Sequence, residues 1–169
     1  MIPLIPEIKK ILYVTDLSKN ARYAFGYAAH LGNLTGAGIT ILHVLEERSP
    51  YSASLVMNIL GEEKWKELRE TNTQQVTETI RDRLQHFCED VSAQMPTCSF
   101  ITDDIVIKIG DPVEEILRLG KAGNFDLVVM GAHGHGMLED AMIGSTSRRV
   151  LRRCTKPVLV VRLPVNGKA

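Results

Sequence analysis

Glycine and hydroxyl residues gather in one stretch of this sequence, from Gly131 to Thr146. Glycine lets the backbone approach a ligand closely, and successive unpaired N–H groups can form a concave anion site. Gly144, Ser145 and Thr146 open a predicted helix, whose first N–H groups and positive dipole end also attract anions. The stretch therefore indicates a phosphate site made mainly of backbone. The alternative is a tight turn in which Ser145 is only a helix cap.

Other phosphate and catalytic motifs do not fit this stretch. It lacks the Gly-x4-Gly-Lys-[Ser/Thr] pattern and the GxSxG pattern, and the dinucleotide pattern GxGxxG fails after Gly136. His133, His135, Glu139 and Asp140 superficially resemble a metal cluster, but no helical spacing such as HExxH holds them together. We therefore expect no protein-held metal and no catalytic residue here, and we expect His133 to lie near the phosphates.

Apolar segments and helical periodicities alternate along the chain and predict the elements that position this loop. The predicted strands are 8–15, 39–45, 105–109, 125–130 and 157–162. The predicted helices run from an N-cap at Ser18 to Gly36, over 62–94, from a cap at Asp111, and over 145–154. Residues 46–61 have no clear period, so we expect a long loop with one helical turn at most, acting as a lid or a partner surface.

This order predicts one α/β domain over residues 1–169. Strands that are apolar on both faces, separated by amphipathic helices, indicate a parallel sheet covered on both sides. We expect a doubly wound, five-stranded, Rossmann-like three-layer sandwich with strand order 3-2-1-4-5. Its ligand crevice would lie between the first and fourth strands, where Asp16 and the Gly131 loop leave the sheet.

Composition excludes several classes of protein. Lys plus Arg and Asp plus Glu both number 20, so a nucleic-acid partner held by bulk charge is not expected. No apolar run approaches the ~20 residues that span a bilayer, and the N-terminus is not a secretory signal. The three cysteines form no CxxC pair, which predicts reduced thiols and a cytoplasmic location.

The glycine loop matches, residue for residue, the pattern G-x2-G-x9-G-[ST] at Gly131, Gly134, Gly144 and Ser145. In this pattern the chain resembles the universal stress proteins, specifically their ATP-binding branch. The likeness extends to four further segments, 10–18, 42–44, 129–134 and 156–161, and so covers nearly the whole chain. It implies the adenine nucleotide alpha hydrolase-like fold. Two positions differ from the residues usual in the family: Val14 stands where proline is frequent, and Ala132 where Ser or Thr is frequent.

The resemblance implies a role for each matched position. Asp16 would accept hydrogen bonds from ribose, and the backbone of Val44 would contact adenine, with Thr15 and Met130 nearby. Gly131 would let the ribose-phosphate region approach. Gly134, Gly144, Ser145 and Thr146 would hold the phosphates. Mg²⁺ would be bound mostly by the phosphates and water. AMP or ADP would share the adenosine half of the site.

Three functions follow from this resemblance and the residues. The first is a regulatory stress-response protein that holds ATP-Mg²⁺ and is read by an unidentified protein partner. The second is a slow ATP hydrolase, at most a weak ATPase. The third is a ligand-free structural dimer. The resemblance also implies a homodimer through the exposed edge of strand 157–162, whereas in a monomer the tail 163–169 would cover that edge.

Overall fold

The computed structural model describes residues 4–46, 50–91, 102–134 and 143–164. Its strands are β1 (Lys10–Thr15), β2 (Gly38–Glu46), β3 (Thr102–Gly110), β4 (Leu127–Gly131) and β5 (Val158–Val161). They form one five-stranded sheet in the order β3-β2-β1-β4-β5, and all neighbours run parallel. The predicted strand order and α/β class are confirmed.

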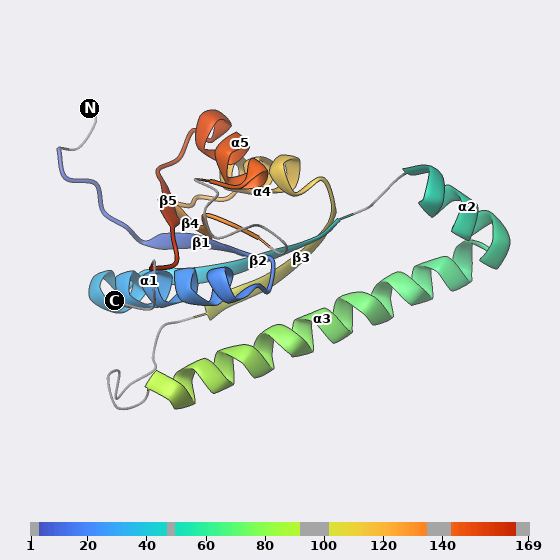
Figure 1. The fold of residues 1–169 in the computed structure, drawn as a ribbon, viewed down its shortest axis with the longest axis horizontal. Coiled ribbons are helices and arrows are strands. Elements are labelled where there is room, and N and C mark those ends of the chain that lie inside the picture. The colour runs from blue at the N-terminus through green and yellow to red at the C-terminus, as the bar shows by residue number, and fades with distance from the viewer. Residues whose placement is uncertain (1–3, 47–49, 92–101, 135–142, 165–169) are drawn as a thin grey trace.

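Helices cover both faces of the sheet. They are α1 (Lys19–Thr35), α2 (Pro50–Leu60), α3 (Glu62–Val91), α4 (Pro112–Ala122) and α5 (Ser145–Arg153). Figure 1 shows α1 and α3 on one side of the sheet and α4 and α5 on the other. In the described part of the chain, no helix is long and apolar enough to cross a membrane.

Two apolar layers hold the sandwich together, one on each face of the sheet. Alternate residues of β1 point to opposite faces, so Ile11 and Tyr13 join the layer beneath α1 and α3. Leu12 joins the layer beneath α4 and α5. All three are at most 4% exposed. A strand buried on both faces must be apolar throughout, which explains the continuous apolar run in the sequence.

The segment that we expected to be a loop contains helix α2, so that prediction was wrong. Pro50 is its first residue, and Gly61, at φ 85°, follows its last. Both are usual at these helix ends. The helix carries no charged residue and makes its contacts with α3, while Leu55 and Ile59 stay 49% and 72% exposed. Polar and apolar residues mix along it, and its apolar residues stay exposed, so this stretch of the sequence shows no clear period.

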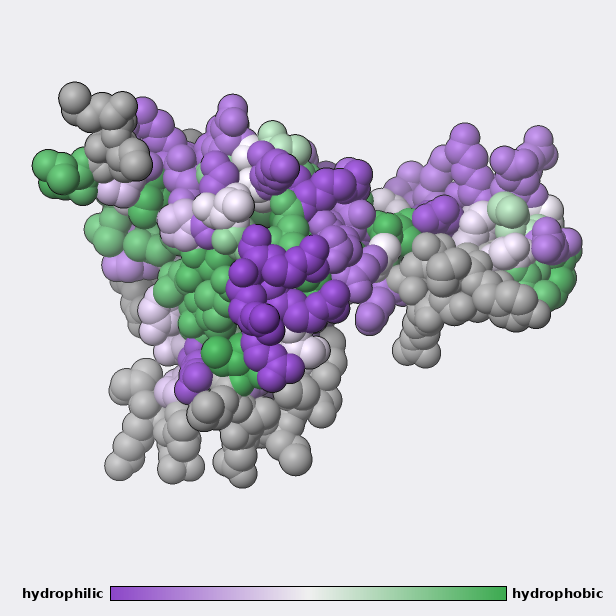
Figure 2. Space-filling model, turned by 90° about the horizontal axis from the view of Figure 1, so that it is seen from above, coloured by the Kyte–Doolittle hydropathy of each residue, from purple (hydrophilic) through white to green (hydrophobic). Residues whose placement is uncertain are grey.

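The long helix predicted over 62–94 is observed as α3, and residues 92–94 lie outside the described residues. Its first half and α2 form an arm (residues 50–75) that stands apart from the sandwich, as Figures 1 and 2 show. Its second half packs on the core, where Ile80 is 3% exposed and Val76, Leu84 and Phe87 contact the layer beneath α1.

Tyr13 joins the sheet to the start of α1 and provides a test of this packing. Its hydroxyl donates a 2.6 Å hydrogen bond to the Ala21 carbonyl, and burial raises the pKa of that hydroxyl, which keeps it protonated. Tyr13→Phe should lower the free energy of unfolding by about 1 kcal/mol because one buried hydrogen bond is lost. Tyr27→Phe, on a side chain 45% exposed, should change it by less than about 0.5 kcal/mol. Urea unfolding followed by circular dichroism measures both, and equal values would contradict the assignment.

Candidate functional site

A cavity of about 360 Å³ lies at the carboxyl ends of β1, β2 and β4. The helices that follow β1 and β4 cover opposite faces of the sheet, so the chain winds away from this point in both directions. The cavity is lined by Val14, Thr15, Asp16, Ala21, Val44, Glu46, Pro112, Ile116, Met130, Gly131, His133, Gly134, Gly144, Ser145, Thr146 and Ser147. All ten residues that the sequence singled out are among them.

Asp16 follows β1 in a turn that orients its carboxylate. The N–H of Leu17 donates to Thr15 Oγ1 at 3.0 Å, and the N–H of Ser18 donates to Asp16 Oδ1, also at 3.0 Å. The Nδ1–H of His43 donates to the Thr15 carbonyl at 2.8 Å, which ties β2 to the end of β1. His43 is 9% exposed and is a hydrogen-bonded core histidine.

Two hydrogen bonds hold the beginning and end of the glycine loop together. The N–H of Gly144 donates to the Ala132 carbonyl at 2.8 Å, and Ser147 Oγ donates to the Gly131 carbonyl at 2.9 Å. A Cβ at position 144 would lie 3.1 Å from that Ala132 oxygen, closer than side chains normally approach. The first turn of α5 is thereby fixed beside the end of β4.

The first turn of α5 faces the cavity through Ser145, Thr146 and Ser147. The first N–H groups of a helix have no partner within it and carry partial positive charge. Gly144 is the N-cap, so no side chain competes for these amides from the cap position. Together with the Ser145 and Thr146 hydroxyls, they form a donor-rich wall suited to an anion.

Asp16 and Gly134 lie against each other in the cavity lining. A Cβ added to Gly134 would lie 2.6 Å from Asp16 Oδ2, a distance that real Cβ atoms do not reach. The turn at His133 and Gly134 therefore lies directly against Asp16 Oδ2, whereas the Ser18 N–H donates to Oδ1. Any side chain at position 134 would displace this carboxylate or leave its own backbone conformation.

Asn20 anchors the other side of the same turn. Its Nδ2 donates to the His133 carbonyl at 2.8 Å, and the residue is 4% exposed. Among the described residues, the buried atoms Asn20 Oδ1 and His133 Nδ1 have no hydrogen-bond partner. His133 lines the cavity, while its Nδ1 is buried within the protein.

The sequence missed the lining residues contributed by α4. Asp111 caps that helix by accepting from the Glu114 N–H at 3.0 Å, and Pro112 and Ile116 then face the cavity. The predicted strand order could have indicated that α4 lies beside the cavity. A helix that connects β3 to β4 must cross over β2 and β1, because these two strands lie between them. Glu46 was missed because β2 extends one residue beyond its predicted end.

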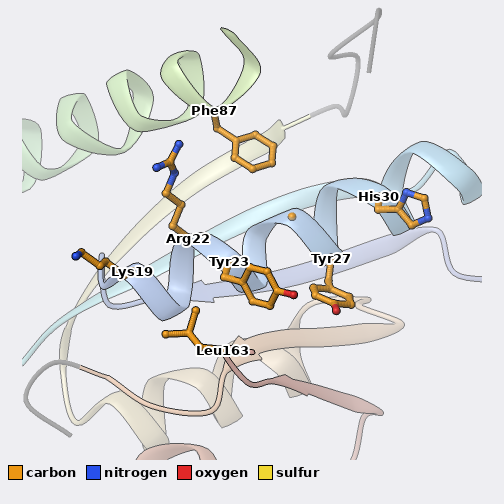
Figure 3. Close-up of a pocket in the computed structure, with 8 residues that line it drawn as sticks. Lys19, Arg22, Tyr23, Tyr27, His30, Phe87 and Leu163 are labelled. Atoms are coloured by element: carbon orange, nitrogen blue, oxygen red, sulfur yellow. The ribbon is translucent and has the colours of Figure 1, made fainter. Parts of the chain in front are cut away.

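Two further cavities lie beside helices α1 and α3. One of about 660 Å³ runs along the outer side of α1, where Figure 3 shows Tyr23, Tyr27 and Leu163. Another of about 400 Å³ lies beneath α3 and shares Thr15 with the strand-end cavity. Of the ten predicted residues, only Thr15 lines either of these cavities.

A sequence model described as the universal stress protein family matches residues 7–162. The chain belongs to the universal stress protein family. Universal stress protein MJ0577 of Methanocaldococcus jannaschii is 28% identical over 154 residues, which are 91% of this chain and 94% of that protein. Its solved structure superposes with a TM-score of 0.71 over 95% of this chain and 100% of that chain.

Two other solved universal stress proteins share the fold at lower identity. One, from Archaeoglobus fulgidus in complex with dAMP, has a TM-score of 0.57 and 15% identity over 92% of this chain and 98% of that one. Another, in complex with cAMP, has a TM-score of 0.54 and 21% identity over 93% of this chain and 98% of that one.

Proposed function

We propose that this universal stress protein binds an adenine nucleotide, ATP with Mg²⁺, in the strand-end cavity and acts as a nucleotide-dependent regulatory protein. The observation that carries the proposal is that all ten residues predicted from the sequence to contact the nucleotide line one cavity. The dAMP and cAMP complexes of the two other family members support the ligand class.

The cavity offers a different chemistry to each part of the ligand. The α5 amides, Ser145 and Thr146 are donors suited to the phosphates. The carboxylate of Asp16 accepts hydrogen bonds and suits the ribose hydroxyls. Val44 and Met130, at the ends of β2 and β4, supply apolar surface for the base.

Mg²⁺ would be held mainly by phosphate oxygens and water in this proposal. Among the described residues, no group of three or more His, Cys, Asp or Glu side chains could hold a metal ion. His135, Glu139 and Asp140 lie outside the described residues. Bound to the phosphates, Mg²⁺ would offset their negative charge, which is its usual role beside nucleotides.

Binding rather than fast hydrolysis is the activity that the lining favours. Phosphoryl transfer to water needs a group that orients the water and a cation that stabilises the transferred phosphoryl. The ionisable side chains among the described lining residues are Asp16, Glu46 and His133, with no lysine or arginine. We therefore propose that any turnover is slow and that occupancy itself carries the signal.

Mass spectrometry of small molecules released from the purified protein tests this function. The proposal predicts an adenine nucleotide, together with a rise in melting temperature when ATP and Mg²⁺ are added. A protein that releases no nucleotide and shows no thermal shift would be the ligand-free scaffold instead. Phosphate release then separates binding from slow hydrolysis, and the identity of the released nucleotide distinguishes ATP from ADP or AMP.

We also propose that β5 pairs with its copy in a homodimer. The carbonyls of Pro157 and Val161 accept from β4, so the intervening N–H of Val160 points away from β4 toward the sheet edge. Val160→Pro would remove this outward donor and leave the bonds to β4 in place. Light scattering after size exclusion should show a dimer for the native chain and a monomer for the variant. A native monomer would contradict this proposal.

A further inference from the structure

The turn between β1 and α1 has an unusual backbone. Leu17 has φ 66°, and within the described part of the chain it is the one residue other than glycine with positive φ. This region is disfavoured for a side chain of this size because Cβ crowds the following carbonyl. Surrounding structure must therefore hold Leu17 in place. Its side chain packs against the core layer, and its N–H donates to Thr15 Oγ1.

A third interaction on Leu17 comes from a distant part of the sequence. The Leu17 carbonyl accepts a hydrogen bond from the guanidinium of Arg83, which lies on α3. This end of α3 is firmly docked, because Ile80 is buried and Phe87 packs its ring edge against Phe25 with centroids 5.0 Å apart. Figure 3 shows Phe87 directed from α3 toward α1. The backbone that carries Arg83 is therefore held in place, although the Arg83 side chain is exposed.

The bond at Leu17 bears on the carboxylate beside it. Leu17 separates Asp16 from Ser18, and the Ser18 N–H orients Asp16 through Oδ1. The carbonyl that Arg83 holds and this N–H belong to the same peptide unit, so they cannot rotate independently. Fixing the carbonyl therefore fixes the direction of the N–H and, through it, the position of Asp16 Oδ2 against Gly134.

We propose that Arg83 is a positioning residue for the nucleotide site, acting through the Leu17–Ser18 peptide on Asp16. The proposal rests on the function proposed above. It adds that α3, the helix of the arm, strengthens the interaction of Asp16 with the ribose hydroxyls of the nucleotide. Arg83 belongs to no nucleotide motif and is outside the described lining of the strand-end cavity.

The test compares ATP with 2′,3′-dideoxy-ATP, which keeps the base and triphosphate but lacks the two ribose hydroxyls. Titration calorimetry should give a native chain that prefers ATP about tenfold, as expected for hydrogen bonds to a charged group. In Arg83→Ala this preference should fall to about twofold, with the affinity for the dideoxy compound unchanged. Arg83→Lys should recover part of the preference because an ammonium group can still donate to the carbonyl.

Arg81→Ala is the matched control, since Arg81 is an exposed arginine on the same helix and lies outside the described lining of both cavities. It should keep the native preference. A second check uses the Asp16→Asn background, in which Arg83→Ala should no longer alter the preference for ATP.

The outcomes separate the two proposals. If the native chain binds both nucleotides and Arg83→Ala weakens both equally, Arg83 only docks the helix and the inference is wrong. An unchanged preference in Arg83→Ala would overturn it as well. If the native chain binds neither compound, the proposed function itself fails. Should Arg83→Ala fold poorly, Arg83→Met takes its place, since methionine keeps most of the side-chain length but cannot donate a hydrogen bond. A native preference for ATP in Arg83→Met, with the amide signals of Leu17 and Ser18 unchanged, would contradict the inference.

Discussion

Gly134→Glu is expected to abolish ATP binding, lowering the affinity by about 100-fold or more. The added Cβ alone would lie 2.6 Å from Asp16 Oδ2. The new carboxylate would also bring a second negative charge beside Asp16, where the phosphates must approach. Two like charges at this distance repel each other and the anionic ligand. Titration calorimetry with ATP and Mg²⁺ measures the loss.

The fold should survive this substitution because position 134 is exposed. Gly26→Glu makes the same chemical change on α1, where a Cβ would have open space around it, and should leave ATP binding intact. Gly134→Ala should have an intermediate effect, since it displaces Asp16 without adding charge. A Gly134→Glu protein that has the melting temperature of the native chain and still binds ATP normally would contradict the assignment of the phosphate site.

Asp16→Asn is expected to weaken ATP binding by about tenfold or more, because a hydrogen bond to a charged group is worth more than one to a neutral group. Asparagine keeps an Oδ1 that can accept from the Ser18 N–H, so the turn at the start of α1 is preserved. The dideoxy compound should bind with little change, since it lacks the hydroxyls that Asp16 is proposed to hold. Competition calorimetry measures both affinities.

Asp126→Asn is the matched control for this change. Asp126 precedes β4 at the opposite end of the sheet, where its carboxylate accepts from the Lys9 and Lys10 N–H groups at 2.8 and 2.9 Å. This variant should bind ATP as the native chain does. Equal losses of ATP and dideoxy-ATP in Asp16→Asn would show that Asp16 supports the turn and has no role toward ribose.

The arrangement of the sheet could be predicted because its strands are buried on both faces. Residues such as Ile11, Leu12 and Val129, each fully buried, leave no polar side for a strand to expose. The parallel order then places the ends of β1 and β4 side by side, with Val14 paired to Met130. Asp16 and the glycine motif had to meet at that point, so the nucleotide-motif part of the cavity lining followed from sequence.

The arm and the Leu17 turn could not be predicted in the same way. Polar and apolar residues mix in helix α2 without a clear period, and Pro50 and Gly61 mark its ends. A leucine at positive φ contradicts the preference of its residue type. Its contact with Arg83 spans 66 residues and depends on how α3 docks, which local sequence does not specify.

A crystal grown with excess ATP and Mg²⁺ tests the central claim most directly. The account predicts electron density for one nucleotide in the strand-end cavity, with its phosphates at the first turn of α5 and its ribose hydroxyls within hydrogen-bonding distance of Asp16. A cavity that stays empty under these conditions, or that side chains of the protein fill, would contradict the account.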